Sequence, residues 1–221
     1  MEHWKAVKRL LRYLRGTVDL GLTYKGRVNL EGYTDANWAG DTECRSTGGY
    51  VFFLNGGAIS WSSKRQKAVA LSSCESEYYA ASAAVSECIW LRRLCKELGM
   101  RTENATSIVW EDNQGAIALS QNPVKRTTSR HIDVRYHFLR QHVKAKTVEL
   151  KYVRTKDNVA DALTKPLPRP IFLVHRNKLM GEQAKPYKFV YTGGMDLIQH
   201  EKRNCPRYNS TGMGECWYVQ Y

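Results

Sequence analysis

Residues 28–35 show the clearest alternation of side chains in the chain. One set of positions holds Val28, Leu30, Gly32 and Thr34, and the other holds Asn29, Glu31, Tyr33 and Asp35. This two-residue period is that of a β-strand, whose successive side chains point to opposite faces. Because Asp35 stands where the pattern ends, we expect it at a rim of the sheet rather than buried. A plain turn aspartate is the alternative, since Asp favours turns.

Two more β-rich segments follow directly. Ser46 to Asn55 is rich in β-formers, Gly56-Gly57 is a turn signal, and Ala58 to Ser63 alternates again. Together with the first strand, they predict a three-stranded antiparallel meander.

One long helix is predicted from Ser72 to Gly99. Ser72 is a candidate N-cap, and Gly99 is a typical helix end. Small residues in the middle would let the helix lie close against a sheet: Ala80, Ala81, Ala83 and Ala84. Glu75 and Glu77 are two residues apart, so they face different ways on a helix. Glu77 shares the closely packed face with Ala80, Ala81 and Ala84, whereas we expect Glu75 to face water.

A carboxylate follows a second strand at Asp112. Thr106 to Glu111 has the pattern of a short apolar strand, and Gly115 to Ser120 that of a helix. Asp112 therefore fits two roles, a carboxylate presented at the strand end or the N-cap of the helix.

The remaining patterns predict three more elements. A helix is expected from about Asp133 to Lys144 and a strand from about Thr147 to Val153. A last helix is expected from roughly Asp157 to Thr164, before Pro166 ends it. Asp161 lies inside that helix, so it is no cap, and a lone carboxylate there usually faces solvent.

The two ends of the chain differ from this middle part. Residues 2–15 have the spacing of an amphipathic helix with a basic surface, and Gly16 ends it. Because this helix begins almost at Met1, we interpret it as the end of something longer. Beyond about Gly181 no periodicity is sustained, and we expect little stable structure there.

Positive charge is concentrated in two segments. Of the net charge of +13, residues 1–27 hold seven basic and two acidic residues and residues 121–156 hold ten and two, so the rest is balanced. Clustered Lys and Arg indicate a polyanionic partner, because phosphate contacts release counterions. A solvated surface is the alternative.

Composition weighs against several function classes. No apolar run approaches membrane-spanning length and the basic start is unlike a signal peptide, so we expect an intracellular protein, cytoplasmic or nuclear, without a membrane partner. The six cysteines form no CxxC pair, which favours reduced thiols. A metal site is not favoured by the spacing of His131, His137 and His142.

Six blocks occur in one order along the chain: GYTDANWAGD, GGYVFFLNGGAISWSSKRQ, VALSSCESEYYAASAAVSECIWLRRLCKELG, VWEDNQGAIALSQNPV, RHIDVRYHFLR and YVRTKDNVADALTKPL. Together they resemble the ribonuclease H domain of copia-type retrotransposon polyproteins. The opening HWKAVKRLLRYLRGT resembles the connection segment between reverse transcriptase and that domain. The resemblance covers about residues 3–181 and divides the chain into a connection-type basic helix (1–27), a ribonuclease H-like domain (28–180) and an irregular tail (181–221).

This resemblance implies an α/β fold of the ribonuclease H type, with a mixed five-stranded sheet whose first three strands are antiparallel and which helices flank. It implies an endonuclease that cleaves the RNA strand of RNA–DNA hybrids with two Mg²⁺ ions, for which Mn²⁺ could substitute. The family's catalytic and metal-binding acids match Asp35 in YTDAN, Glu77 in ESEY, Asp112 in EDNQ and Asp161 in VADAL. Glu77 is preferred because it precedes a bulky Tyr and then small residues; Glu75 is the fallback.

Four gathered carboxylates suit this chemistry, because Mg²⁺ prefers oxygen ligands. Two ions about 4 Å apart can activate water and stabilise the departing 3′ oxygen during attack on a phosphodiester. Without metal the acids would repel one another. Our hypothesis places Asp35 between both ions, with Glu77 and Asp112 on one side and Asp161 on the other.

Recognition of a hybrid would depend on its shallow minor groove and its 2′-hydroxyls. The candidate nucleic-acid-binding residues are Ser72, Ser73, Asn113, Gln114, Lys125, Arg126 and Arg130. Helix capping and plain surface charge are their alternatives. Many ribonucleases H carry a Gly–His pair before the last helix, whereas this chain has Thr155-Lys156-Asp157, so no histidine is given that role.

Two functions remain open at this point. One is an active hybrid nuclease that works beside a reverse transcriptase domain, which the four intact acids favour. The other is a catalytically idle, nucleic-acid-binding remnant of a degenerate retrotransposon, which the early start and the unrelated tail favour. An integrase or resolvase of the same fold would need a different carboxylate set.

Overall fold

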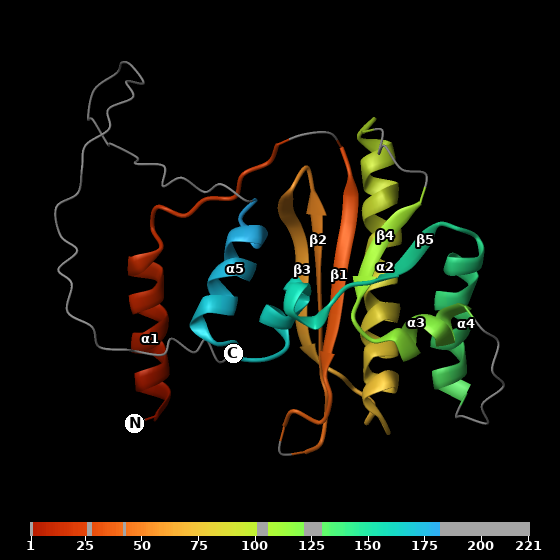
Figure 1. Cartoon of the computed structure of the whole chain (residues 1–221), viewed down its shortest axis with the longest axis horizontal. Coiled ribbons are helices and arrows are strands. Elements are labelled where there is room, and N and C mark those ends of the chain that lie inside the picture. The colour runs from red at the N-terminus through yellow and green to blue at the C-terminus, as the bar shows by residue number, and fades with distance from the viewer. Residues whose placement is uncertain (1, 26–27, 42, 101–105, 122–129, 182–221) are drawn as a thin grey trace.

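The computed structural model describes residues 2–25, 28–41, 43–100, 106–121 and 130–181, with side chains in the last range described from residue 137. A five-stranded sheet forms its centre, in the spatial order β3-β2-β1-β4-β5 (Figure 1). The strands are β1 (Leu30–Asn37), β2 (Thr47–Leu54), β3 (Gly57–Arg65), β4 (Ser107–Glu111) and β5 (Val148–Tyr152). The first three pair antiparallel, whereas β4 is parallel to both β1 and β5. The predicted mixed sheet and meander are confirmed.

The hairpin between β2 and β3 turns at Asn55 and Gly56, one residue earlier than predicted. Their φ angles are +54° and +80°, and positive φ at both central residues is the conformation of the two-residue turn that matches strand twist. Gly57 already belongs to β3, opposite Leu54. The sequence therefore predicted the turn to within one residue, with Gly56-Gly57 in place of Asn55-Gly56 as its central pair.

Helices cover both faces of the sheet. On one face α2 (Ser73–Glu97) contacts β1 and β2, and α3 (Gln114–Gln121) and α4 (Arg130–Lys144) join it (Figure 1). On the other face, the 3-10 helix η2 (Val159–Leu163) contacts β1 and β2. It is joined by α5 (Arg169–Leu179), which has no counterpart among the predicted elements.

Neighbouring residues of β2 supply two separate cores. Phe52 packs with Tyr78 and Val85 of α2, whereas Val51 packs with Val159 of η2. Side chains of a strand alternate between faces, so one strand can be buried on both. The sheet thus requires η2 as well as α2 to cover it, and η2 carries Asp161.

The single helix expected from roughly Asp157 to Thr164 is divided in the structure. The chain instead forms two short 3-10 helices, η1 (Thr155–Asp157) and η2, separated by Asn158. Asn158 is fully buried, and its Nδ2 donates to the backbone oxygen of Thr34 at 2.9 Å. Its Oδ1 accepts the N–H of Ala160 at 3.2 Å. This side chain fastens the segment to β1 and prevents one continuous helix.

The predicted N-terminal helix is present as α1 (Glu2–Gly16), and none of its residues is buried. The ring of Tyr13 meets the ring of Phe172 in α5 edge to face, with centroids 6.2 Å apart. Across the described residues, no helix has both the length and the apolar character to cross a membrane. Cys88 and Cys95 are buried and free, as expected for helix residues. The prediction for the tail lies outside the described residues.

Candidate metal centre

Asp35 lies in β1 and is buried, 1% exposed, so its predicted position at an open rim is wrong. The covering residues come from η2 and the residue after it: Thr164 Oγ1 donates a hydrogen bond to Asp35 Oδ2. Gly49, the partner of Asp35 on β2, makes room for this cover. A Cβ at Gly49 would lie 2.8 Å from Thr164 Cγ2. The carboxylate of Asp35 is therefore covered by Thr164 and does not lie on an open rim of the sheet.

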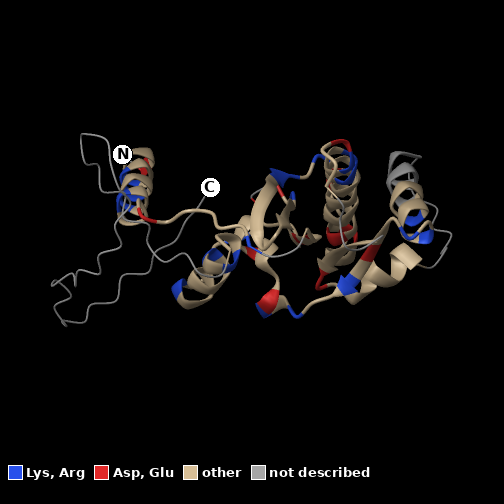
Figure 2. Cartoon of the chain, turned by 90° about the horizontal axis from the view of Figure 1, so that it is seen from above, with Lys and Arg blue, Asp and Glu red and all other residues tan. Residues whose placement is uncertain are grey.

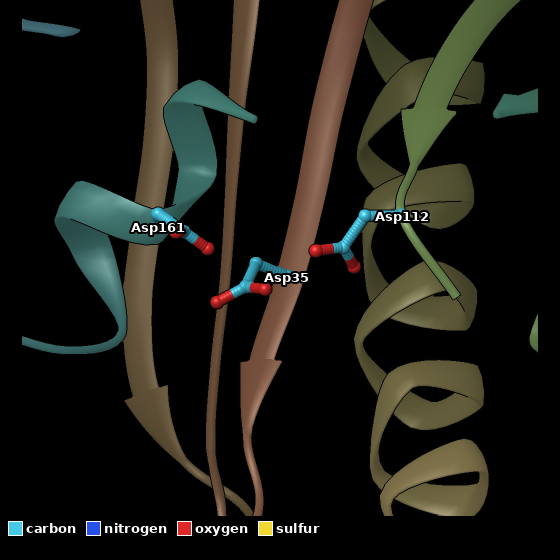
Figure 3. Close-up of side chains that lie close together, drawn as sticks. All are labelled: Asp35, Asp112 and Asp161. Carbon is cyan, nitrogen blue, oxygen red and sulfur yellow. The ribbon is translucent and has the colours of Figure 1, made fainter. Parts of the chain in front are cut away.

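Asp35, Asp112 and Asp161 converge from three elements. Each offers a carboxylate oxygen, and these oxygens all lie within 4.8 Å of one another. Figure 3 shows Asp35 between the other two, with Asp112 leaving the end of β4 and Asp161 on η2. Because β1 and β4 are parallel neighbours, residues near their carboxyl ends meet at one edge of the sheet.

Asp112 is not the cap of the helix that follows it. Asn113 Oδ1 accepts the N–H of Ala116 at 3.0 Å, which is the N-cap contact of α3. Of the two roles that the sequence left open, Asp112 therefore has that of the strand-end carboxylate.

A second group of carboxylates contains Glu77, Glu111 and Asp112. Their oxygens also lie within 4.8 Å of one another, and Asp112 belongs to both groups. Glu77 is on the buried face of α2 with Ala80, Ala81 and Ala84, as predicted. Glu111 was missed, although the sequence held a signal: Ser107, Val109 and Glu111 alternate along β4 on its buried face.

Glu75 is buried, contrary to the expectation that it faces water. Its Oε2 accepts the N–H of Leu71 at 2.7 Å and its Oε1 accepts the hydroxyl of Tyr79 at 2.8 Å. Both carboxylate oxygens are thus engaged at the start of α2. Glu75 belongs to neither group of converging acids, which supports Glu77 over the fallback.

No family model matches this chain. It is 48% identical over 173 residues to the retrovirus-related Pol polyprotein from transposon TNT 1-94 of Nicotiana tabacum, over 77% of this chain and 13% of the relative. Against the Pol polyprotein from transposon RE1 of Arabidopsis thaliana, the identity is 42% over 188 residues, covering 84% and 13% of the two chains. The chain is homologous to a segment of copia-type retrotransposon Pol polyproteins. It spans about one eighth of the length of these relatives.

Among solved structures, this Pol homologue is similar to the N-terminal RNase H domain of a Mycobacterium tuberculosis protein. The TM-score is 0.46 at 13% sequence identity, over 68% of this chain and 97% of that one. The mixed five-stranded sheet, with its first three strands antiparallel, is the ribonuclease H-like arrangement that the resemblance implied.

Burial and mutual repulsion raise the pKa values of the acids in this Pol homologue. Burial, followed by Asp161, raises the pKa of Asp35 to about 6. Burial, followed by Glu111, raises the pKa of Glu77 to about 11. Burial also raises the pKa of Glu111, Asp112 and Asp161. A nearby positive charge would reverse this effect, because it favours the ionised form.

The donor set fits divalent cations. Glu77 Oε2 and Glu111 Oε2 are buried and have no hydrogen-bond partner among the described residues. Burying a polar group without a partner is costly, and carboxylate oxygens are the ligands that Mg²⁺ prefers. The residues present can therefore hold such an ion, and gain from doing so.

The candidate nucleic-acid-binding residues divide into two sets. Ser72 caps α2, since its hydroxyl oxygen accepts the N–H of Glu75 at 3.2 Å, while Ser73 and Gln114 are exposed. Capping, the alternative role, is thus present at Ser72 and Asn113, and nucleic-acid contacts by these four residues stay predictions. Lys125 and Arg126 lie outside the described residues, as does the side chain of Arg130.

Proposed function

We propose that this chain is a ribonuclease H-type nuclease that uses Mg²⁺, or Mn²⁺ in its place, to cleave the RNA strand of RNA–DNA hybrids. The observation that carries the proposal is the convergence of acids from β1, α2, η2 and the end of β4. The homology to Pol polyproteins supports the same activity. Because the chain spans a small part of those relatives, a reverse transcriptase domain is the partner that we propose for it.

The proposed ligands and catalytic residues are Asp35, Glu77, Asp112 and Asp161. Divalent cations held there would supply the charge that activates water and stabilises the leaving oxygen. The protein's own part is to hold these carboxylates in place. Thr164 donates to Asp35, and Lys165 Nζ lies 2.8 Å from Asp161 Oδ1.

Hybrid recognition is proposed for residues close to the carboxylates in sequence. Ser72 and Ser73 precede Glu77 at the start of α2, and Asn113 and Gln114 follow Asp112. Short polar side chains of this kind can contact 2′-hydroxyls and sugars in a shallow groove without reading base sequence. The basic segment with Lys125, Arg126 and Arg130 would contact phosphates.

Cleavage of a hybrid with end-labelled RNA, followed on a gel with Mg²⁺ or with EDTA, tests the proposal. We expect Mg²⁺-dependent products from the full chain. Asp112→Asn should lower the rate more than about 100-fold, because Asp112 belongs to both carboxylate groups. Its hybrid affinity, measured by fluorescence anisotropy, should stay close to that of the wild type.

Glu75→Gln is the matched control, a buried glutamate of the same helix as Glu77 but outside both groups. It should cleave at the wild-type rate. Near-normal cleavage by Asp112→Asn would make the ligand assignment wrong. Salt-sensitive binding by the wild type without any product would instead identify the idle remnant.

A further inference from the structure

Glu111 is a buried acid that the four proposed ligands leave without a role. It is the last residue of β4 and is fully buried. On this strand, Val109 packs in the core that α2 covers, and Glu111 lies on the same face two residues later. Its carboxylate therefore lies between the sheet and α2, where Glu77 also lies.

The two oxygens of Glu111 have different surroundings. Oε1 accepts the N–H of Asn113 at 3.0 Å. Oε2 has no hydrogen-bond partner among the described residues, and the same is true of Glu77 Oε2. Two buried carboxylates with unpartnered oxygens, both close to Asp112, would be costly unless a cation or a proton compensates them.

We propose that Glu111 is a fifth acidic ligand, which forms a divalent-cation position together with Glu77 and Asp112. Asp35, Asp112 and Asp161 would form the other position. Asp112, which belongs to both groups, would then be the shared ligand in place of Asp35, to which the sequence hypothesis gave that role. This inference deepens the proposed function and rests on it for the presence of divalent cations. The competing role for Glu111 is a neutral glutamic acid that accepts the Asn113 N–H and binds no ion.

Glu111→Gln separates these roles, because the amide oxygen can still accept the N–H of Asn113 while the charge is removed. The full chain, free of nucleic acid, is titrated with Mn²⁺ and the unbound ion is followed by electron paramagnetic resonance. We expect two bound ions in the wild type and in the Glu75→Gln control. Glu111→Gln should bind one of them roughly 10-fold more weakly or worse and leave the other unchanged.

Unchanged binding of both ions by Glu111→Gln would overturn the inference, as would fewer than two ions bound to the wild type. A measurement on the wild type guards against a variant that does not fold. In ¹³C NMR of glutamate side chains, the Glu111 carboxyl resonance should move and saturate as Mg²⁺ is added. A resonance that stays in place also overturns the inference.

Failure of this inference and failure of the proposed function leave different results. Hybrid cleavage by the wild type together with unaltered Mn²⁺ binding by Glu111→Gln rejects the ligand role alone. Two-site binding that Glu111→Gln impairs, without hybrid cleavage under any metal, rejects the nuclease and keeps the ligand.

Discussion

Lys165 brings a positive charge into the acidic centre. Its ammonium lies 2.8 Å from Asp161 Oδ1 and is partly buried. Burial alone would lower the pKa of Lys165. The negative charges of Asp35 and Asp161 raise it by more, so the net shift of the pKa is upward. The ammonium thus partly compensates the carboxylates when no divalent cation is bound, and it competes with such a cation for them.

Replacing Lys165 by Met should therefore have opposite effects on stability and on metal affinity. Without metal, we expect the Tm to fall by a few degrees, since a loss of about 1 kcal/mol in the free energy of unfolding lowers the Tm by about 2–4 °C in a chain of this size. The Mg²⁺ affinity should rise about tenfold, because one competing charge a few ångströms away is removed. Calorimetric titration and thermal unfolding with and without Mg²⁺ measure both.

The matched control is Lys156→Met, which removes an exposed lysine of η1. It should change neither quantity. Weaker Mg²⁺ binding by Lys165→Met would mean that Lys165 supports the metal site rather than competing with the ion.

Asp35 should make the stability of the metal-free protein depend on pH. Its pKa is raised from 3.8 to about 6, by burial first and Asp161 second. Between these values the folded state binds more protons than the unfolded state, so stability falls as pH rises. We expect the Tm in EDTA to decline from about pH 4 to beyond pH 6, and to decline less in Asp35→Asn.

Excess Mg²⁺ should reduce this decline, because the ion binds the ionised carboxylates. Thermal unfolding across the pH range, with EDTA or with Mg²⁺, gives the four curves needed. Parallel curves for the wild type and Asp35→Asn in EDTA would show that Asp35 does not titrate in this window.

At the scale of elements, Asn158 holds η2 on β1 and so positions Asp161. Its Nδ2 donates to the Thr34 oxygen and its Oδ1 accepts from Ala160. Asn158→Ala should lower the free energy of unfolding by about 1–3 kcal/mol, because the backbone oxygen of Thr34 would lose this hydrogen-bond donor. It should also weaken Mg²⁺ binding, although Asn158 is no ligand, since Asp161 loses its support.

Val148→Ala provides a control of similar destabilisation. Val148 is buried in β5, within the core that α2 covers. This variant should lower the Tm without changing the Mg²⁺ affinity, both measured as above. Equal loss of Mg²⁺ affinity in the two variants would attribute the effect to general instability.

Elements that depend on neighbours in sequence were predictable from pattern alone. The meander follows from alternation and a turn signal, and α2 from its cap and its small residues. The two 3-10 helices η1 and η2 were not predictable in this way, because the hydrogen bond that shapes this segment joins Asn158 to Thr34, 124 residues apart. A period can predict a helix, but it does not reveal a distant hydrogen bond that interrupts it.

The same distinction holds for the candidate site. The resemblance implied that Asp35 and Asp112 belong to one site. The structure supplies the reason, because the two parallel strands that carry them end at one edge of the sheet. Glu75 was misplaced because its burial depends on its hydrogen-bond donors, Leu71 and Tyr79. Glu111 was missed as a member of the site because it joins the other acids only through its closeness to Glu77. That closeness comes from the packing of α2 on the sheet.

Over the described part of the molecule, basic and acidic residues are unevenly distributed. Figure 2 shows Lys and Arg on the helix beside the N-terminus and a group of Asp and Glu near the middle. An acidic centre repels the phosphates of a nucleic acid, whereas a basic segment attracts them. Affinity for a hybrid should therefore come from basic residues and depend strongly on salt.

We predict different roles in hybrid binding for the two basic segments, residues 1–27 and residues 121–156. We expect the phosphates to lie along residues 121–156, so the triple change Lys125→Ala, Arg126→Ala and Arg130→Ala should lower affinity for all hybrid sequences alike. The slope of log affinity against log salt should fall by about one for each side chain that no longer binds a phosphate. Fluorescence anisotropy at several salt concentrations measures it, in an Asp112→Asn background that leaves the hybrid uncut.

The matched change on α1 removes Arg9, Arg12 and Arg15, which subtracts the same charge from the other basic segment. Its salt slope should stay near that of the parent, because net charge alone acts at a distance and is screened within about 10 Å at 0.1 M salt. A slope lowered by the α1 variant and not by the other would place the phosphates along α1. The phosphate-binding role predicted for Lys125, Arg126 and Arg130 would then be wrong, while the carboxylate centre would be unaffected.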